Sequence, residues 1–246
     1  MVLIKIIEKL RVLSPNYLKL LINDKKFLKQ VSLYQVMNKY ENTLNKVALV
    51  GCGNSISKYK PIENVTYIGI NRSFKYENIK LDYLFIQDKF PEGMNEANAY
   101  SSEACKKFYG IIPKSTRYLQ NNFLNTFSSE DNDVIAANAS VYYLKPGCRQ
   151  KFTKNLNKFP IADLKGTVFS ALQFALYAGA KEIYLVGCDC SSGHFYASKK
   201  DSKLNYQIAI WKKMKKVLSK KFPDVKIYSV NPVNLKGLFE DIYQEV

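Results

Sequence analysis

The sequence has few residues that build disulfides or metal sites. It contains a single histidine, His194, and an odd number of irregularly spaced cysteines: Cys52, Cys105, Cys148, Cys188 and Cys190. A secreted disulfide framework uses paired cysteines, so we expect reduced thiols in a cytoplasmic protein. Cys188, Cys190 and His194 lack a fourth ligand and the usual spacing of a structural zinc site. No metal site is predicted.

Long apolar runs are also missing. No stretch of 18 apolar residues occurs, so no membrane span is predicted, and charges interrupt the opening segment MVLIKIIEKLRVL, unlike a secretory signal. Apolar residues at helical spacing over 3–13, and a second basic segment to about residue 40, predict an amphipathic helical extension over 1–46. Two roles stay open for it: packing on its own domain, or peripheral docking on a partner or the inner membrane.

Acidic residues are scarce relative to basic ones. Lys and Arg number 37 against 21 Asp and Glu, a formal charge of +16. Residues 141–221 hold sixteen basic residues against four acids, a net of +12. Such a field concentrates anions such as nucleotides, although lysines also decorate ordinary solvated surfaces. The sequence shows no basic stripe interleaved with aromatics, so no nucleic-acid partner is predicted.

Alternating strand and helix signals predict the fold. Apolar β-rich runs occur at 47–50, 66–71, 81–88, 182–187 and 225–232, and helical patterns follow Gly166 and span 204–222. This order predicts an α/β fold over 47–246: a Rossmann-like, doubly wound, mostly parallel sheet. Residues 92–160 are polar and weakly periodic. We expect them to be partly an insertion or lid, with a possible strand at 116–119.

Polar residues follow the predicted strands where a parallel sheet binds ligands. The strand ends hold Gly51, Gly53, Asn54 and Ser55, then Asn71, then Gln87 and Asp88, and finally Asp189 and His194. The GCGNS turn permits close approach of a ligand, but it is neither a dinucleotide fingerprint nor a Walker loop, because Ile56 replaces the last glycine and no G-K-[ST] follows. Asp189 either binds a sugar hydroxyl or caps its loop. His194 is either accessible and titratable or a hydrogen-bonded structural residue.

Two sequence blocks resemble a known family. LVGCGNSISKYKP followed by YIGIN, and GTVFSALQFALYAGAKEIYLVGCDC, resemble the bacterial sialyltransferases of glycosyltransferase family 42. The blocks are also similar to flagellin-glycosylation accessory domains. The match covers about residues 47–90 and 164–232, and the second block is the more specific.

The resemblance implies a metal-independent enzyme that needs no cofactor and transfers a sugar from a CMP-activated donor to a glycan or glycolipid of the bacterial surface, in lipopolysaccharide or capsule biosynthesis. It implies that Gly51–Ser55 surround the phosphate and ribose, that Asn71 and Gln87 hold the nucleotide and sugar, and that Gly166 and Thr167 contact the sugar carboxylate. Tyr196 and Tyr206 would hydrogen-bond the leaving phosphate. Related transferases often form homo-oligomers.

One departure from the family leaves alternatives open. The family's catalytic base is a histidine in the segment before the last helix, whereas the corresponding KKDSKLNYQ has none and the sole histidine is His194. Either His194 is the base, or the chemistry differs, or the domain only binds. The fold group also includes archaeal hydroxymethylpterin pyrophosphokinases, which use ATP and Mg²⁺. In that case Asp88 and Asp189 would be metal-linked carboxylates.

Overall fold

The computed structural model describes residues 39–88, 94–100, 105–112, 127–128, 140–145, 156, 161–162, 164–191, 193–197 and 206–244, and residues 15, 18, 19 and 22. Most of the predicted extension 1–46 and the possible strand at 116–119 lie outside the described residues.

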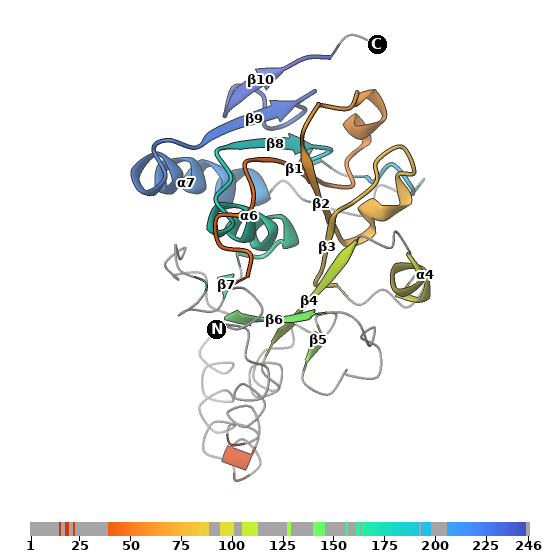
Figure 1. Cartoon of the computed structure of the whole chain (residues 1–246), viewed down its shortest axis with the longest axis vertical. Helices are drawn as coiled ribbons and strands as arrows, with labels where there is room; N and C mark the ends of the chain where they lie inside the picture. Colours follow the sequence, from red (N-terminus) through yellow and green to blue (C-terminus); the bar gives the residue numbers. More distant parts are fainter. Residues whose placement is uncertain are drawn as a thin grey trace, which may run out of the picture.

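One sheet organises the described part of the chain (Figure 1). Its strands are β1 (Lys46–Val50), β2 (Thr66–Ile70), β3 (Tyr83–Ile86), β4 (Lys106–Ile112), β5 (Phe127–Ser128), β6 (Ser140–Lys145), β7 (Ile161–Ala162), β8 (Glu182–Val186), β9 (Lys226–Val230) and β10 (Glu240–Ile242). Their order is β10-β9-β8-β1-β2-β3-β4-β6-β7, with β5 beside β4. These neighbouring strands pair in parallel. The predicted Rossmann-like parallel sheet is confirmed.

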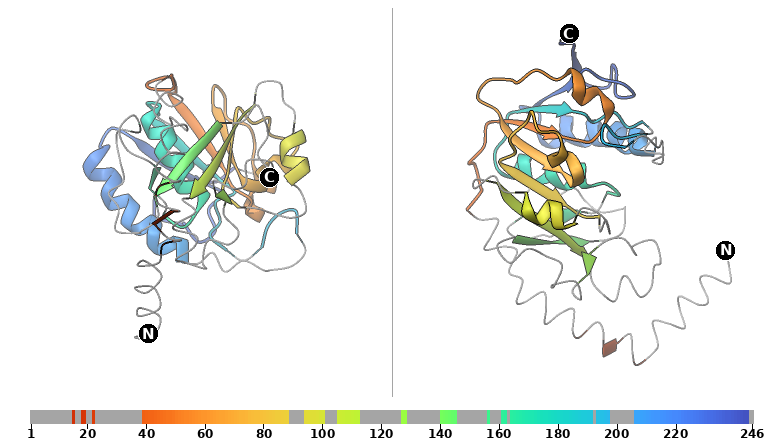
Figure 2. Two further views of the ribbon diagram at one scale, coloured as in Figure 1. Left: turned by 90° about the horizontal axis from the view of Figure 1, so that it is seen from below. Right: turned by 90° about the vertical axis from the view of Figure 1, so that its right-hand side faces the viewer.

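Helices lie on both faces of this sheet (Figures 1 and 2). On one side are α6 (Thr167–Tyr177) and α7 (Tyr206–Lys221), and on the other are α4 (Met94–Ala99) and the 3₁₀ helices η1 (Asn54–Lys58) and η2 (Asn71–Lys75). Because side chains alternate along a strand, Val47 and Leu49 enter the core under α6, while Ala48 and Val50 enter the core on the opposite face. Strands buried on both faces explain the apolar runs of the sequence.

The folded domain begins before β1. Tyr40 is buried, and its ring packs edge-on against Tyr83, Phe108 and Phe174 at centroid distances of 5.3–5.8 Å. The Leu44 amide donates to the Ala178 carbonyl at 2.8 Å. The end of the segment 1–46 is therefore part of the sheet domain.

Residues 92–160 contribute more to the sheet than the sequence analysis expected. Within them, β4 pairs with β3, and β6 pairs with β4. In the sequence, Lys107 interrupts the apolar run expected of a buried strand. In the structure it is a buried lysine whose Nζ donates to the Asn98 carbonyl at 2.5 Å. The described parts of this segment thus extend the core sheet.

No helix among the described residues is both long enough and apolar enough to cross a bilayer.

Candidate functional site

The candidate site lies where the strand order reverses. From β1 the chain adds β2, β3 and β4 on one side, and later adds β8 and β9 on the other. Ligands of open parallel sheets bind outside the carboxyl ends of the strands at such a switch point. The loops that follow β1, β2 and β8 all reach this edge. It is where the sequence analysis placed the candidate residues.

The two turns after β1 and β8 are in close contact. The Gly51 amide donates to the Val186 carbonyl and the Gly53 amide to the Gly187 carbonyl, both at 2.8 Å. A Cβ at Gly51 would lie 2.5 Å from the Gly187 oxygen, and one at Gly53 would lie 2.4 Å from the Asp189 Cγ. The two turns therefore pack so closely that glycine is required at both positions.

Asp189 caps the turn after β1. Its carboxylate accepts hydrogen bonds from the Ser55 amide at 2.9 Å and from the Ser55 hydroxyl, and it is 4% exposed. The capped turn is the neighbouring one after β1, not the loop to which Asp189 itself belongs. Ser55 belongs to the turn that the resemblance places around the phosphate and ribose, and its amide is directed at Asp189.

Asn71 is the centre of a second polar network. It has a positive φ of 50°, which asparagine tolerates. Its Nδ2 donates to Asp88, and its Oδ1 accepts from the Gln87 amide at 3.1 Å and the Thr167 hydroxyl at 3.3 Å. Gln87 is buried and its Nε2 donates to Ser170 at 2.6 Å. The Gln87 side chain thus supports α6, and Asp88 is the exposed member of the group.

The start of α6 lies beside this network. Thr167 opens this 11-residue helix, whose first turn has no acidic residue. A helix start carries partial positive charge, which favours a phosphate or carboxylate. Tyr206 lies at the outer side of this start, where its hydroxyl donates to the Lys165 carbonyl at 2.9 Å and its side chain is 48% exposed.

His194 and Tyr196 form an aromatic pair above the turn after β1. Their rings stack with centroids 5.2 Å apart and an interplanar angle of 8°. The Phe195 amide donates to the Cys52 carbonyl at 3.0 Å, which fixes the loop to the turn. Two cations approach the Tyr196 ring: the Arg72 guanidinium carbon at 5.7 Å and the Lys75 Nζ at 5.9 Å from its centroid.

The environment favours the uncharged forms of both aromatic residues. Burial and, to a lesser extent, the positive charge of Arg72 lower the pKa of His194 below its ordinary 6.5, against a hydrogen bond to the Cys52 backbone. Burial raises the pKa of Tyr196 to about 12. At neutral pH, His194 is therefore an unprotonated imidazole, and Tyr196 keeps its hydroxyl proton.

The cysteines of the site are thiols in apolar surroundings. β8 ends at Val186, and Gly187 has a left-handed φ of 61°, so Cys188 and Cys190 belong to the loop that follows the strand. Both pack against the same core cluster on the α6 side, and burial raises both pKa values. Within the described residues, no group of three or more His, Cys, Asp and Glu side chains is placed to hold a metal ion.

The titration of His194 can be measured directly because it is the only histidine. We expect the imidazole of tag-free protein to titrate below pH 6.5 by NMR, since burial and Arg72 disfavour its charged form. In Arg72→Gln the midpoint should move up, because a repelling positive charge is removed. A wild-type midpoint above 6.5, or a downward shift in the variant, would contradict this arrangement.

Sequence reasoning missed Arg72, Lys75 and Ser170. Arg72 directly follows Asn71 at the end of the second predicted strand, so its position in the sequence could have identified it as a candidate site residue. Ser170 comes one helical turn after Thr167, on the same side of α6. The role of Lys75 depends on the bend made by η2 and had no comparable signal.

Comparison with known proteins gave no match to any protein-family model, curated protein or solved structure.

Proposed function

We propose that the protein is a sialyltransferase-like glycosyltransferase that moves a sugar from a CMP-activated donor to a bacterial surface glycan or glycolipid. The proposal places it in the cytoplasm, at the inner surface of the membrane. The observation that carries it is the grouping of His194, Tyr196 and Arg72 at the switch point of the sheet. The sequence resemblance supports the choice of donor.

In this proposal His194 is the general base. It removes the proton of the acceptor hydroxyl as the oxygen bonds to the sugar carbon, while the bond from that carbon to the donor phosphate breaks and CMP leaves. A base must be unprotonated at working pH, and the lowered pKa of His194 satisfies this requirement.

Arg72 and Tyr196 stabilise the departing phosphate. Negative charge grows on CMP as the bond breaks, and fixed donors aimed at that charge lower the barrier. Tyr196 keeps its proton because its pKa is about 12, so its hydroxyl can donate to a phosphate oxygen. Arg72 supplies a permanent positive charge beside it.

Thr167, Asn71 and the start of α6 contribute to donor binding. The Thr167 hydroxyl and Asn71 are joined at 3.3 Å next to the positive end of the helix. This end suits the carboxylate of an acidic sugar. Asn54, which is exposed beside Gly193, borders the same edge.

A thermal-shift panel of CMP, UDP, GDP and ATP tests the proposal. A ligand that binds only the folded state raises the melting temperature, and at about 100 times its Kd it adds about 2.7 kcal/mol to the free energy of unfolding. We expect CMP to give the largest shift, with EDTA present. Stabilisation by ATP with Mg²⁺ alone would instead favour the pyrophosphokinase class. If no nucleotide shifts the melting temperature, the transferase proposal is contradicted and a non-catalytic binding module is the remaining interpretation.

A further inference from the structure

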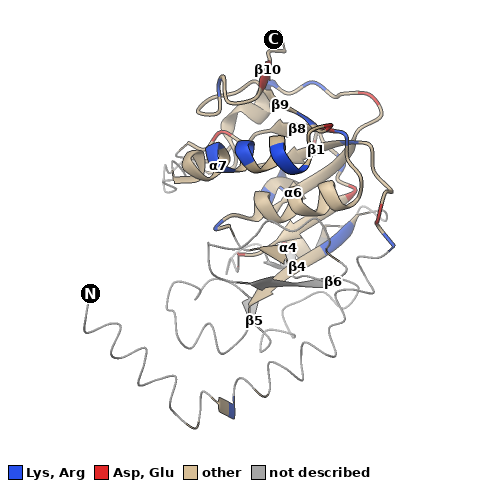
Figure 3. Ribbon diagram, turned by 90° about the vertical axis from the view of Figure 1, so that its left-hand side faces the viewer, with Lys and Arg blue, Asp and Glu red and all other residues tan. Residues whose placement is uncertain are grey.

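Helix α7 has one face made of lysines. Its sequence, YQIAIWKKMKKVLSKK, contains no acidic residue. Trp211, Met214 and Leu218 are buried. The exposed positions of the helix include five lysines: Lys212, Lys213, Lys215, Lys216 and Lys220. Spacings of three and four residues place them on one side of the helix, and Figure 3 shows the blue band that they form on the outer surface. We call these five residues the lysine face.

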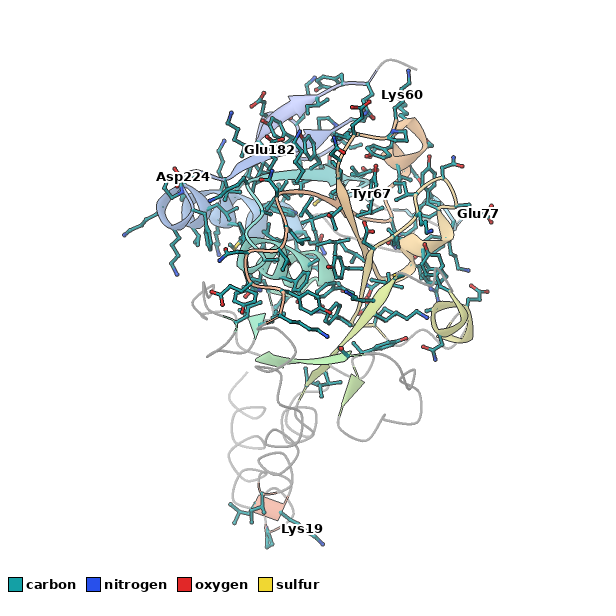
Figure 4. The ribbon with its side chains drawn as sticks, viewed as in Figure 1. Lys19, Lys60, Tyr67, Glu77, Glu182 and Asp224 are labelled. Carbon is teal, nitrogen blue, oxygen red and sulfur yellow. The ribbon has the colours of Figure 1, made fainter. Side chains whose placement is uncertain are left out.

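None of the five lysines forms an ion pair with another residue of the part of the chain that the structure describes. The pairs Lys46–Glu182 and Lys75–Glu96 both lie outside the lysine face. The nearest acid along the chain is Asp224, which follows the end of α7 (Figure 4). Five cations that repel one another on one helix face therefore present a strong positive field to an external partner.

We infer that the lysine face docks the protein on a lipid bilayer that contains anionic headgroups. The partner must be anionic to complement the face. The exposed positions carry no arginine and, apart from Tyr206 at the first residue, no aromatic ring. Sequence-reading or single-strand nucleic-acid surfaces use arginine forks and stacked aromatics, whereas lysines act as point charges on a diffuse anionic surface. The face thus fits a bilayer better than a nucleic acid.

The position of α7 relates this surface to the candidate site. The Tyr206 hydroxyl donates to the Lys165 carbonyl, and the Gln207 amide lies beside Gly166, so the first turn of α7 touches the start of α6. A protein lying on its lysine face would hold this edge of the site close to the bilayer. Binding to vesicles, however, is measured without turnover and does not depend on the proposed reaction.

Vesicle binding by full-length, tag-free protein tests the inference. Each lysine near an anionic surface raises partitioning by about fivefold. Wild-type protein should therefore bind phosphatidylcholine vesicles containing phosphatidylglycerol, fail to bind pure phosphatidylcholine, and dissociate as salt is raised. Lys212→Gln/Lys216→Gln should weaken binding about 25-fold, corresponding to two such factors.

A matched variant distinguishes the lysine face from net charge alone. Lys58→Gln/Lys60→Gln removes the same charge from exposed positions in and after η1, away from α7 (Figure 4). This variant should bind vesicles within about twofold of wild type if binding depends on the lysine face and not on the net charge of the protein. An equal loss in both double variants, or no vesicle binding by wild type, would overturn the inference. Tighter binding to a DNA duplex than to the vesicles, lost in the α7 variant, would reassign the face to nucleic acid.

Discussion

Replacing His194 by glutamine is expected to lower kcat by about 10²–10⁴-fold, the usual contribution of a general base. The measurement is the release of CMP from the CMP-activated sugar that the protein accepts. The affinity for CMP itself should change little, because the role proposed for His194 concerns the acceptor hydroxyl. Glutamine removes the titrating group from a loop fixed by the hydrogen bond between Phe195 and Cys52.

The pH profile separates catalysis from a structural role for His194. Wild-type kcat/KM should fall on the acidic side with a midpoint below 6.5, because protonation removes the base and the pKa of His194 is lowered. The glutamine variant should lose this limb and retain only a low, flatter rate. If the variant keeps most of its activity, or keeps the acidic limb, His194 is not the base.

Replacing Gly51 by alanine should cost about 3 kcal/mol or more in the free energy of unfolding. The added Cβ would lie 2.5 Å from the Gly187 carbonyl oxygen and 3.3 Å from the Cys188 Sγ. The clash is with backbone at the end of β8, which is hydrogen-bonded to β1 and β9, so neither side can move freely. Overpacking typically costs about 1–3 kcal/mol and occasionally more, and here the nearest atom is a backbone oxygen, not the end of a flexible side chain. Denaturant unfolding measures the loss.

Gly237→Ala is the matched control for this variant. Gly237 has a φ of 71° and no atom within 4 Å of an added Cβ, so alanine there meets only the conformational cost of about 1–2 kcal/mol. Gly51→Ala should be clearly the more destabilising of the two. An equal or smaller loss would show that the turns after β1 and β8 can separate without penalty.

The sequence predicted the sheet well where strands are apolar on both faces. KVALV and EIYLV form β1 and β8, which pair with each other in the centre of the sheet. The sequence predicted β4 and β6 poorly. In β4, KKFYGII contains the buried Lys107, whose Nζ donates to the Asn98 carbonyl, a partner that lies outside the strand. Local pattern cannot report such a partner.

The candidate site shows the same limit. The carboxyl edge of the sheet could be predicted because parallel strands end together. The direction of each side chain could not, since it depends on tertiary partners. Gln87 turns inward to Ser170 and Asp189 is held by Ser55, whereas Asp88 and His194 stay at least partly exposed. Prediction from strand ends therefore found the edge of the sheet where these residues lie, while the direction of each side chain came from the structure.

The most direct test of the account is a CMP titration, in EDTA, of the tag-free protein followed through the single imidazole of His194. We expect a saturable shift of the imidazole signals and a rise in the His194 pKa, because the bound phosphate brings negative charge next to the ring. Arg72→Gln should weaken CMP binding in the same experiment. Unchanged imidazole signals at saturating CMP would contradict a cytidine-nucleotide site beside His194.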